Sequence, residues 1–267
     1  ITMTHNILVT GANSGIGRAI SNIILKSHPK SSLIFTFRNE ERGTKELEKL
    51  QKSCSNMRIH SHQLDVSDEG SIRRFVPWMK KEIPHGLHCL VNNAGFATKG
   101  ITVNKSIAEQ TLAVNYYGVK NVTDALYNQI VDNGRVVNVS SFVGQAAGMA
   151  ESLKKQFLDP NLSQEQLDAY ITKYLNDVEH GHLEEWTENP HAIPKLAVNA
   201  WTRIRDRDDK RGISYIATCP GWCRTNIGGP KAPRSAEQGA QSVLSGVFGD
   251  AQTMHGGFFR DGKRLPW

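Results

Sequence analysis

The chain has 267 residues, with 39% hydrophobic and 22% charged residues and a formal charge of +6. This apolar content supports a sizeable core and excludes a wholly disordered chain, while runs such as Leu33–Phe37 fall far short of the roughly 20 apolar residues that cross a bilayer. Basic and acidic residues are interspersed and no basic run reaches five residues, so we expect neither a membrane protein nor a nucleic-acid-binding protein.

Strand-type and helical patterns alternate along the chain from its first residues. β-Branched and aromatic runs predict strands at Asn6–Thr10, Leu33–Phe37, Arg58–Leu64, Leu87–Val91, Arg135–Val139, Ile213–Thr218 and Gly257–Phe259. Apolar residues at helical spacing predict helices from Ile16 to a stop at Pro29, over Glu40–Lys52, after an N-cap at Ser67, over Ser106–Val131, over about Pro190–Arg207 and near Ala236–Phe248. Repeated strand–helix–strand units predict an α/β fold of the Rossmann type, with a single doubly wound parallel sheet in one domain spanning residues 1–267.

The long stretch Gly144–Asn189 interrupts this alternation before the helix that begins near Pro190. It holds two helical patterns, one near Ala150–Leu158 and one from Gln164 to about Val178. We interpret the stretch as an inserted helical segment and not as a second domain.

The four cysteines are too sparse for a disulfide scaffold, and no Cys/His spacing is typical of a zinc site. We expect reduced thiols and no metal. No basic region followed by an apolar stretch opens the sequence, so we expect a cytoplasmic protein.

A glycine-rich turn, Thr10–Gly17, directly follows the first strand and opens a helix. Glycines allow a sharp turn close to a phosphate, and the helix N-terminus offers free N–H groups to it. In isolation such a turn is also compatible with a merely strained loop.

Four further segments lie at predicted strand ends or on the helix that follows: Asn92–Gly95, Asn138–Ser141, Lys195 and Pro220–Thr225. Ligands of open α/β sheets bind beyond the carboxyl ends of the strands, so we expect all five segments to share one sheet edge. Taken alone, Asn92–Gly95 fits either a ligand contact or a simple turn.

These motifs make the chain resemble the short-chain dehydrogenase/reductase superfamily, and within it the monomeric carbonyl reductases that use NADPH. The resemblance covers the whole chain and rests on TGxxxGxG at 10–17, LDV at 64–66, NNAG at 92–95, VNYYG around Asn115, RVVNVSS at 135–141, CPGW at 219–222 and GPKA at 229–232.

The resemblance implies a site in which a serine polarises a carbonyl oxygen, a tyrosine protonates it, a lysine binds the nicotinamide ribose and an asparagine holds a water. Ser141, Lys195 and Asn115 match three of these positions. The implied cofactor-binding residues are Gly11, Asn13, Ser14, Gly15, Ile16, Gly17, Arg38, Arg42, Asp65, Val66, Asn92, Ala94, Lys195, Pro220, Gly221, Trp222, Cys223 and Thr225.

The tyrosine position departs from the family pattern Tyr-x-x-x-Lys, because His191 stands four residues before Lys195. A histidine beside a cation is mostly neutral at pH 7, which makes it a poor acid, and its ring is shorter than tyrosine. Pro194 also removes one backbone donor, with a possible displacement of Lys195. Three explanations stay open: a working acid in a modified enzyme, a cofactor-binding relative with little turnover, or a variant substitution.

The residues after the second strand favour NADPH over NADH. Arg38 stands where an NAD-binding relative carries an acid, and Arg42 follows one turn later. A guanidinium pairs well with a 2′-phosphate, although Glu40 and Glu41 are close enough in sequence to compete. The resemblance also implies NADPH.

We therefore expect an enzyme that transfers hydride from NADPH to aldehydes, ketones or quinones, with acid catalysis altered at His191. The alternative is a catalytically impaired NADPH-binding protein that serves as a sensor or partner-binding module. By analogy with relatives that lack the insertion and assemble through the same helices, we expect a monomer.

Overall fold

The computed structural model describes residues 5–54, 58–98, 103–146, 148–187, 189 and 191–267. One sheet in the order β3-β2-β1-β4-β5-β6-β7-β8 runs through them, with β1 to β7 paired in parallel and β8 antiparallel to β7. The strands are β1 His5–Val9, β2 Ser31–Phe37, β3 Arg58–Gln63, β4 Leu87–Asn92, β5 Ile130–Val139, β6 Ser214–Thr218, β7 Phe258–Arg260 and β8 Lys263–Leu265. The doubly wound parallel sheet is thus confirmed, apart from its antiparallel last strand.

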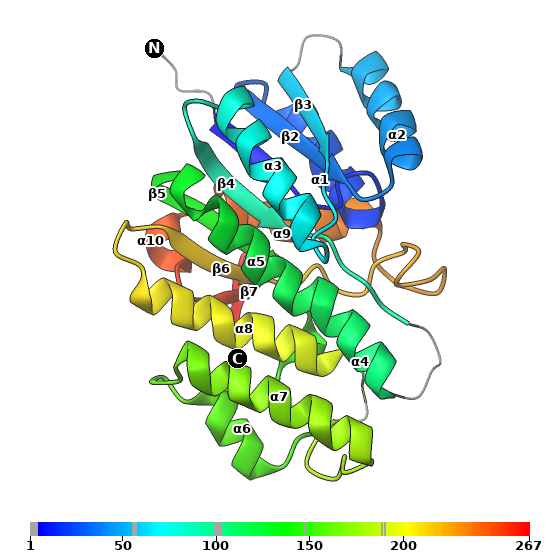
Figure 1. Cartoon of the computed structure of the whole chain (residues 1–267). Helices are drawn as coiled ribbons and strands as arrows, with labels where there is room; N and C mark the ends of the chain where they lie inside the picture. The colour runs from blue at the N-terminus through cyan, green and yellow to red at the C-terminus, as the bar shows by residue number, and fades with distance from the viewer. Residues whose placement is uncertain (1–4, 55–57, 99–102, 147, 188, 190) are drawn as a thin grey trace.

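Helices cover both faces of this sheet (Figure 1). Their bounds are α1 Gly15–Ser27, α2 Glu40–Ser53, α3 Glu69–Glu82, α4 Lys105–Leu112, α5 Gly118–Leu126, α6 Glu151–Leu158, α7 Gln164–His180, α8 Ala192–Asp208, α9 Ala236–Phe248 and α10 Ala251–Met254. One apolar core joins the sheet to α3, α4, α5 and α8 and continues into α6 and α7, while a second joins the opposite face to α1, α2 and α9. Alternate side chains of β1 show the division, since Leu8 belongs to the first core and Ile7 and Val9 to the second.

The long helix predicted over Ser106–Val131 is wrong in its detail. After α4 the chain forms a π-helical turn at Ala113–Tyr117, continues as α5 and closes with a 3₁₀ turn at Tyr127–Gln129. The last two residues of the predicted helix already belong to β5. A π turn holds one more residue than an α turn, and no apolar spacing in the sequence marks where that residue is accommodated.

Two predicted helix starts also move. Asp68, and not Ser67, caps α3, because its carboxylate accepts a hydrogen bond from the Gly70 amide at 2.8 Å. The helix predicted from Pro190 begins at Ala192, and Pro190 itself lies outside the described residues. The short elements α10 and β8 were not predicted, whereas α6 and α7 lie where the sequence placed two helices.

The strand order reverses direction at β1, which has β2 on one side and β4 on the other. The helices that follow β1 and β4 therefore lie on opposite faces of the sheet. Ligands of such sheets bind beyond these two strand ends, and we call this region the crevice. The predicted glycine-rich turn and the Asn92–Gly95 segment are the two loops that bound this crevice.

Candidate active site

The glycine-rich turn after β1 is tightly shaped. Gly11 and Gly15 have φ angles of 61° and 51°, which side chains rarely adopt. A Cβ on Gly17 would lie 2.3 Å from the Gly11 oxygen and 2.4 Å from Asn93 Nδ2. The turn therefore has no room for a side chain at Gly17, because the loop that contains Asn93 packs directly against it.

Thr10 joins this turn to the loop after β4. Its hydroxyl oxygen accepts hydrogen bonds from the amides of Asn93 and Ala94, both at 2.9 Å. In return, Asn93 Nδ2 donates to the Thr10 carbonyl at 2.8 Å. Thr10 and Asn93 were not among the predicted site residues, although both lie inside the motifs that were singled out.

The N-terminus of α1 is open to a ligand. Ser14 precedes it without a side-chain cap, and no acidic residue lies in its first turn. By contrast, Asn39, Asp68 and Asn104 cap α2, α3 and α4 with their side chains. Uncapped N–H groups at a helix start attract an anion, so this turn fits the pyrophosphate of a dinucleotide.

Several predicted cofactor residues direct their side chains into the protein. The Asn92 amide, which is buried, donates to Thr123 and to Asn138, both at 2.9 Å. Val66 is buried against the start of α5, because a Cβ on Gly118 would lie 2.8 Å from its Cγ2. These two side chains support the crevice from below, which is a structural role that the sequence motifs did not separate from ligand contact.

The residues predicted at the adenosine end follow β2 and β3. Arg38 and Arg42 are exposed, and Arg42 lies in the first turn of α2. Asp65 Oδ1 accepts from the Ser67 amide at 2.9 Å and from its hydroxyl at 2.6 Å, so the carboxylate is fixed by a local turn. Two cations and one oriented carboxylate thus flank the crevice beyond β1.

Ser141 follows β5 directly, and the Lys195 side chain reaches the last residue of that strand. Ser141 Oγ accepts from the Val143 amide at 3.4 Å, which leaves the hydroxyl proton to be donated elsewhere. Lys195 Nζ donates to the Val139 carbonyl at 2.6 Å, and Ser140 Oγ donates to the Lys195 carbonyl at 3.4 Å. Burial lowers the pKa of the Lys195 ammonium from its usual 10.5 to about 8.

Asn115 lies at the centre of the π-helical turn and is buried. Its side chain forms two hydrogen bonds with the backbone of Phe96, accepting from the amide at 2.8 Å and donating to the carbonyl at 2.7 Å. The wider turn thus brings an amide from the helix onto the loop that follows β4.

His191 caps the start of α8, and its ring contacts the same loop. Its Nε2 lies 2.9 Å from the carbonyl oxygen of Thr98. Asn189 Oδ1 accepts from the His191 amide at 3.0 Å, which stabilises this helix start from two residues before its N-cap. Pro194 is the third residue of α8, where N–H groups have no partner inside a helix, and α8 continues to Asp208.

Four tyrosines, on the π-helical turn and on α7, are the hydroxyl groups that could stand in for the missing tyrosine. Tyr116 donates to Asp168 at 3.1 Å on the side of α7, and burial raises its pKa. Burial likewise raises the pKa of Tyr117, and it raises that of Tyr174 to about 12. Tyr170 packs its ring against Phe157 in the helical segment. Tyr116 and Tyr170 thus make contacts within the protein, and burial keeps the hydroxyls of Tyr116, Tyr117 and Tyr174 protonated.

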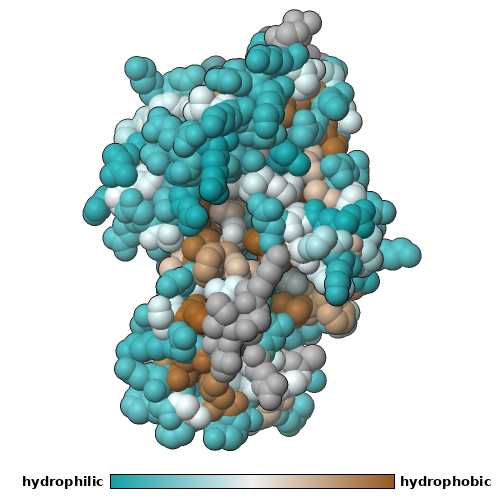
Figure 2. Space-filling model, turned by 90° about the vertical axis from the view of Figure 1, so that its right-hand side faces the viewer, coloured by the Kyte–Doolittle hydropathy of each residue, from teal (hydrophilic) through white to brown (hydrophobic). Residues whose placement is uncertain are grey.

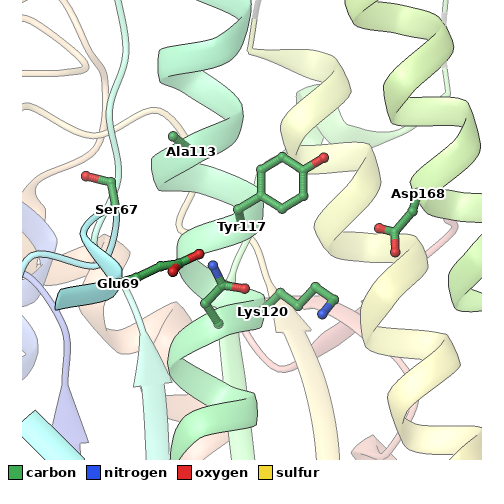
Figure 3. A pocket seen from close by; sticks show the side chains of 7 residues that line it. Ser67, Glu69, Ala113, Tyr117, Lys120 and Asp168 are labelled. Atoms are coloured by element: carbon green, nitrogen blue, oxygen red, sulfur yellow. The ribbon is translucent and has the colours of Figure 1, made fainter. Parts of the chain in front are cut away.

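Tyr117 also lines a separate polar cavity of about 410 Å³ between the start of α3, α5 and α7. Figure 3 shows its ring between Ser67 and Glu69 on one side and Asp168 on the other. The cavity includes none of the four predicted catalytic residues.

The segment after β6 closes the crevice from the side of β1. Thr225 lies against the glycine-rich turn, because a Cβ on Gly15 would be 3.2 Å from its methyl group. Gly221 has a φ of 78°, and Pro220 precedes it. Cys223 is buried with its thiol donating to the Pro220 carbonyl at 3.3 Å, so only its backbone is left for a ligand.

The face of the molecule in Figure 2 has a hollow at its centre, around which hydrophobic surface gathers. Among the described residues, the exposed large apolar side chains are Phe142, Val143, Trp222 and Ile227. They follow β5 and β6 directly, and the Trp222 indole is held by a 2.8 Å hydrogen bond to the Gly228 carbonyl. Apolar side chains beside a polar crevice fit the binding of an uncharged organic substrate.

No disulfide joins any of the four cysteines, and the described part of the chain contains no cluster of three or more side chains able to hold a metal ion. None of its helices has both the length and the apolar character that a bilayer span needs.

The comparisons with known proteins agree with this geometry. The profile of the short chain dehydrogenase family matches residues 5–153. Carbonyl reductase [NADPH] 1 of Mus musculus is 37% identical over 97% of both chains, and that of Bos taurus is 36% identical over 97% of both. The structure of salutaridine reductase from Papaver somniferum superposes with a TM-score of 0.87 at 26% identity, covering 96% of this chain and 99% of that one.

Proposed function

Because the chain belongs to the short-chain dehydrogenase family, we propose that it is an NADPH-dependent reductase of aldehydes, ketones or quinones. The observation that carries this proposal is the set of hydrogen bonds among Thr10, Asn93 and Ala94. They tie the glycine-rich turn to the loop after β4, which is also bonded to Asn115 through Phe96. The names of the relatives, carbonyl reductase [NADPH] 1, support the choice of reaction and cofactor.

The chain's own residues divide the work as follows. The amides at the start of α1 bind the pyrophosphate, and Arg38 with Arg42 pairs with the 2′-phosphate. When bound, NADPH supplies the hydride. Ser141 donates a hydrogen bond from its hydroxyl to the substrate carbonyl oxygen, which makes the carbonyl carbon more electrophilic. After hydride transfer this oxygen takes its proton from water.

Lys195 and Asn115 complete the site. The ammonium of Lys195, partly desolvated, binds the ribose and supplies positive charge where the carbonyl oxygen gains negative charge. The pairing of Asn115 with Phe96 fixes the loop that bounds the crevice. Apolar side chains such as Phe142 and Trp222 exclude water from an uncharged substrate.

The direct test is NADPH oxidation, followed by absorbance, with a panel of quinones, diketones and aldehydes. Turnover with at least one class, abolished by Ser141→Ala, is the expected result. Tight NADPH binding without turnover on any class would contradict the reductase and leave the alternative.

That alternative is an NADPH-binding protein that acts as a sensor or binds a partner. One observation favours it: His191 occupies the position of the family's proton donor, and its Nε2 is bound to the Thr98 carbonyl. The absorbance panel separates the two functions, because cofactor binding without product formation is what the sensor requires.

We also propose that the chain works as a monomer. Residues of α7, including Leu167, Ile171 and Tyr174, are buried in the core that α8 and α4 share. Figure 1 shows α6 and α7 below α8, where they occupy one side of that helix. Light scattering after size-exclusion chromatography, at micromolar concentration, tests this with an expected mass near 29.7 kDa.

A further inference from the structure

The residue at the proton-donor position has a defined protonation pattern. His191 Nε2 lies 2.9 Å from the Thr98 carbonyl oxygen, which carries no proton of its own. The imidazole must therefore donate, so the proton sits on Nε2. In the neutral ring, Nδ1 then carries only a lone pair.

The second ring nitrogen, Nδ1, is also poorly placed to give a proton to a substrate. His191 Nδ1 is buried and has no hydrogen-bond partner among the described residues. A proton added there would be a buried donor with nothing to accept it, which is unfavourable. Both nitrogens are thus unsuited to giving a proton to a substrate, one because it is occupied and one because it is covered.

The loop that His191 holds is the loop of the catalytic edge. It begins at Asn93, which is bonded to Thr10 of the glycine-rich turn, and it passes Phe96, whose amide and carbonyl are both bonded to Asn115. Thr98 then meets His191, 93 residues away in sequence. One loop is therefore fixed in succession by the turn after β1, the π-helical turn and the start of α8.

The start of α8 is rigid enough to serve as this anchor. Asn189 Oδ1 holds the His191 amide at 3.0 Å, and the Ala192 amide donates to the Asn189 carbonyl at 3.0 Å. Four residues later Lys195 is fixed on the Val139 carbonyl. Because the start of α8 is held in this way, the single hydrogen bond from the His191 ring to Thr98 also fixes the loop after β4.

We propose that His191 is a positioning residue that clips the loop after β4 to α8 through its Nε2–H, and that it is not the proton donor. The inference deepens the proposed reductase and rests on it for the effect on turnover. Its structural half, the tautomer and the clip, stands without turnover.

The first experiment reads the tautomer directly. The chain labelled with ¹⁵N-histidine gives signals for its ten histidines, and the one missing from His191→Gln belongs to His191. We expect the proton that bonds to Thr98 to lie on Nε2. A ring whose proton lies on Nδ1 alone would overturn the proposal.

The second experiment compares three variants for NADPH binding, by cofactor fluorescence, and for turnover. His191→Gln keeps a side-chain N–H near the place of Nε2 but cannot titrate, and His191→Phe has no donor. We expect Gln to stay within about twofold of the parent in binding, turnover and pH profile, whereas Phe weakens NADPH binding roughly 2- to 10-fold, as expected for one lost hydrogen bond. His85→Phe, at an exposed position, is the matched control and changes neither.

Three different results would contradict three different parts of the proposal. If Gln binds NADPH normally but loses roughly 100-fold or more in turnover, His191 is a proton donor and the proposal is wrong. If Gln and Phe weaken NADPH equally, the Nε2–H clip is wrong. If no variant, the parent included, binds NADPH, the proposed function fails while the tautomer measurement still decides the clip.

Discussion

At the glycine-rich turn, Thr10, Asn93 and Ala94 exchange three hydrogen bonds, and α1 begins without a side-chain cap. At the start of α8, by contrast, the ring of His191 uses its only donor, Nε2–H, to bond Thr98, and its other nitrogen is buried. We call the region of the glycine-rich turn the nucleotide end and the region of His191 the acid end. The nucleotide end leaves polar groups for a ligand, whereas the acid end uses its polar groups in bonds within the protein. Binding and proton transfer are therefore separable in this chain, and the following measurements sharpen or break that separation.

Replacing Lys195 should have the largest effect, because the lysine belongs to both ends. Lys195→Met removes the cation that we propose binds the ribose, and we expect turnover to fall by roughly 100- to 10,000-fold. The measurement is kcat/KM with NADPH and the best substrate of the panel. Lys30→Met, on an exposed position, is the matched control. A loss below about tenfold would mean that the lysine takes no part in the chemistry.

Restoring the family residue tests the acid end alone. His191→Tyr adds a hydroxyl donor beside Lys195, and we expect kcat to rise by roughly 100-fold. NADPH binding should weaken roughly 2- to 10-fold, as for His191→Phe, because Thr98 loses its histidine donor. Steady-state kinetics with saturating NADPH measure the first effect and fluorescence titration the second. An unchanged kcat would show that the site lacks more than a proton donor.

Reversing one charge tests the nucleotide end alone. Arg38→Glu should weaken NADPH by roughly 10- to 100-fold and leave NADH nearly unchanged, because a charge-assisted pair to the 2′-phosphate is lost. Parallel titrations with both cofactors give the ratio. Arg73→Glu carries the same charge change on an exposed position of α3 and should affect neither. Equal losses for both cofactors would remove Arg38 from the phosphate site.

The smallest expected effect is a change in the free energy of unfolding with pH, caused by the Lys195 ammonium. Burial lowers the pKa of Lys195 from 10.5 to about 8, so the unfolded chain holds this proton more firmly than the folded one. Wild-type stability is reduced below pH 8 and recovers as the pH rises from about 8 to 10.5. Relative to Lys195→Met, the wild type should gain about 2 kcal/mol between pH 7 and 10, after allowing for partial exposure.

Urea unfolding of wild type and Lys195→Met at both pH values measures this gain, and the difference between them cancels the other groups that titrate at high pH. A stability difference that stays constant with pH would show that the ammonium is well solvated in the folded protein.

The sequence predicted the sheet and the shared edge because both follow from local patterns. Apolar runs mark the strands, and Thr10–Gly17 marks a turn that only glycines permit. The contact between His191 and Thr98 was not predicted, since it joins two loops through tertiary packing that no spacing encodes. Similarly, Asn92 reads as a possible ligand contact in sequence, whereas its place between Thr123 and Asn138 depends on how α5 and β5 pack.

The π-helical turn at Ala113–Tyr117 determines how the chain would respond to the loss of one residue. A regular helix over this stretch would need one residue fewer, and the apolar faces of α4 and α5 would then stay aligned. Deletion of one residue here would restore the α-helical hydrogen-bond pattern and turn Asn115 away from Phe96. The loop after β4 would then lose the two hydrogen bonds that hold it to this helix.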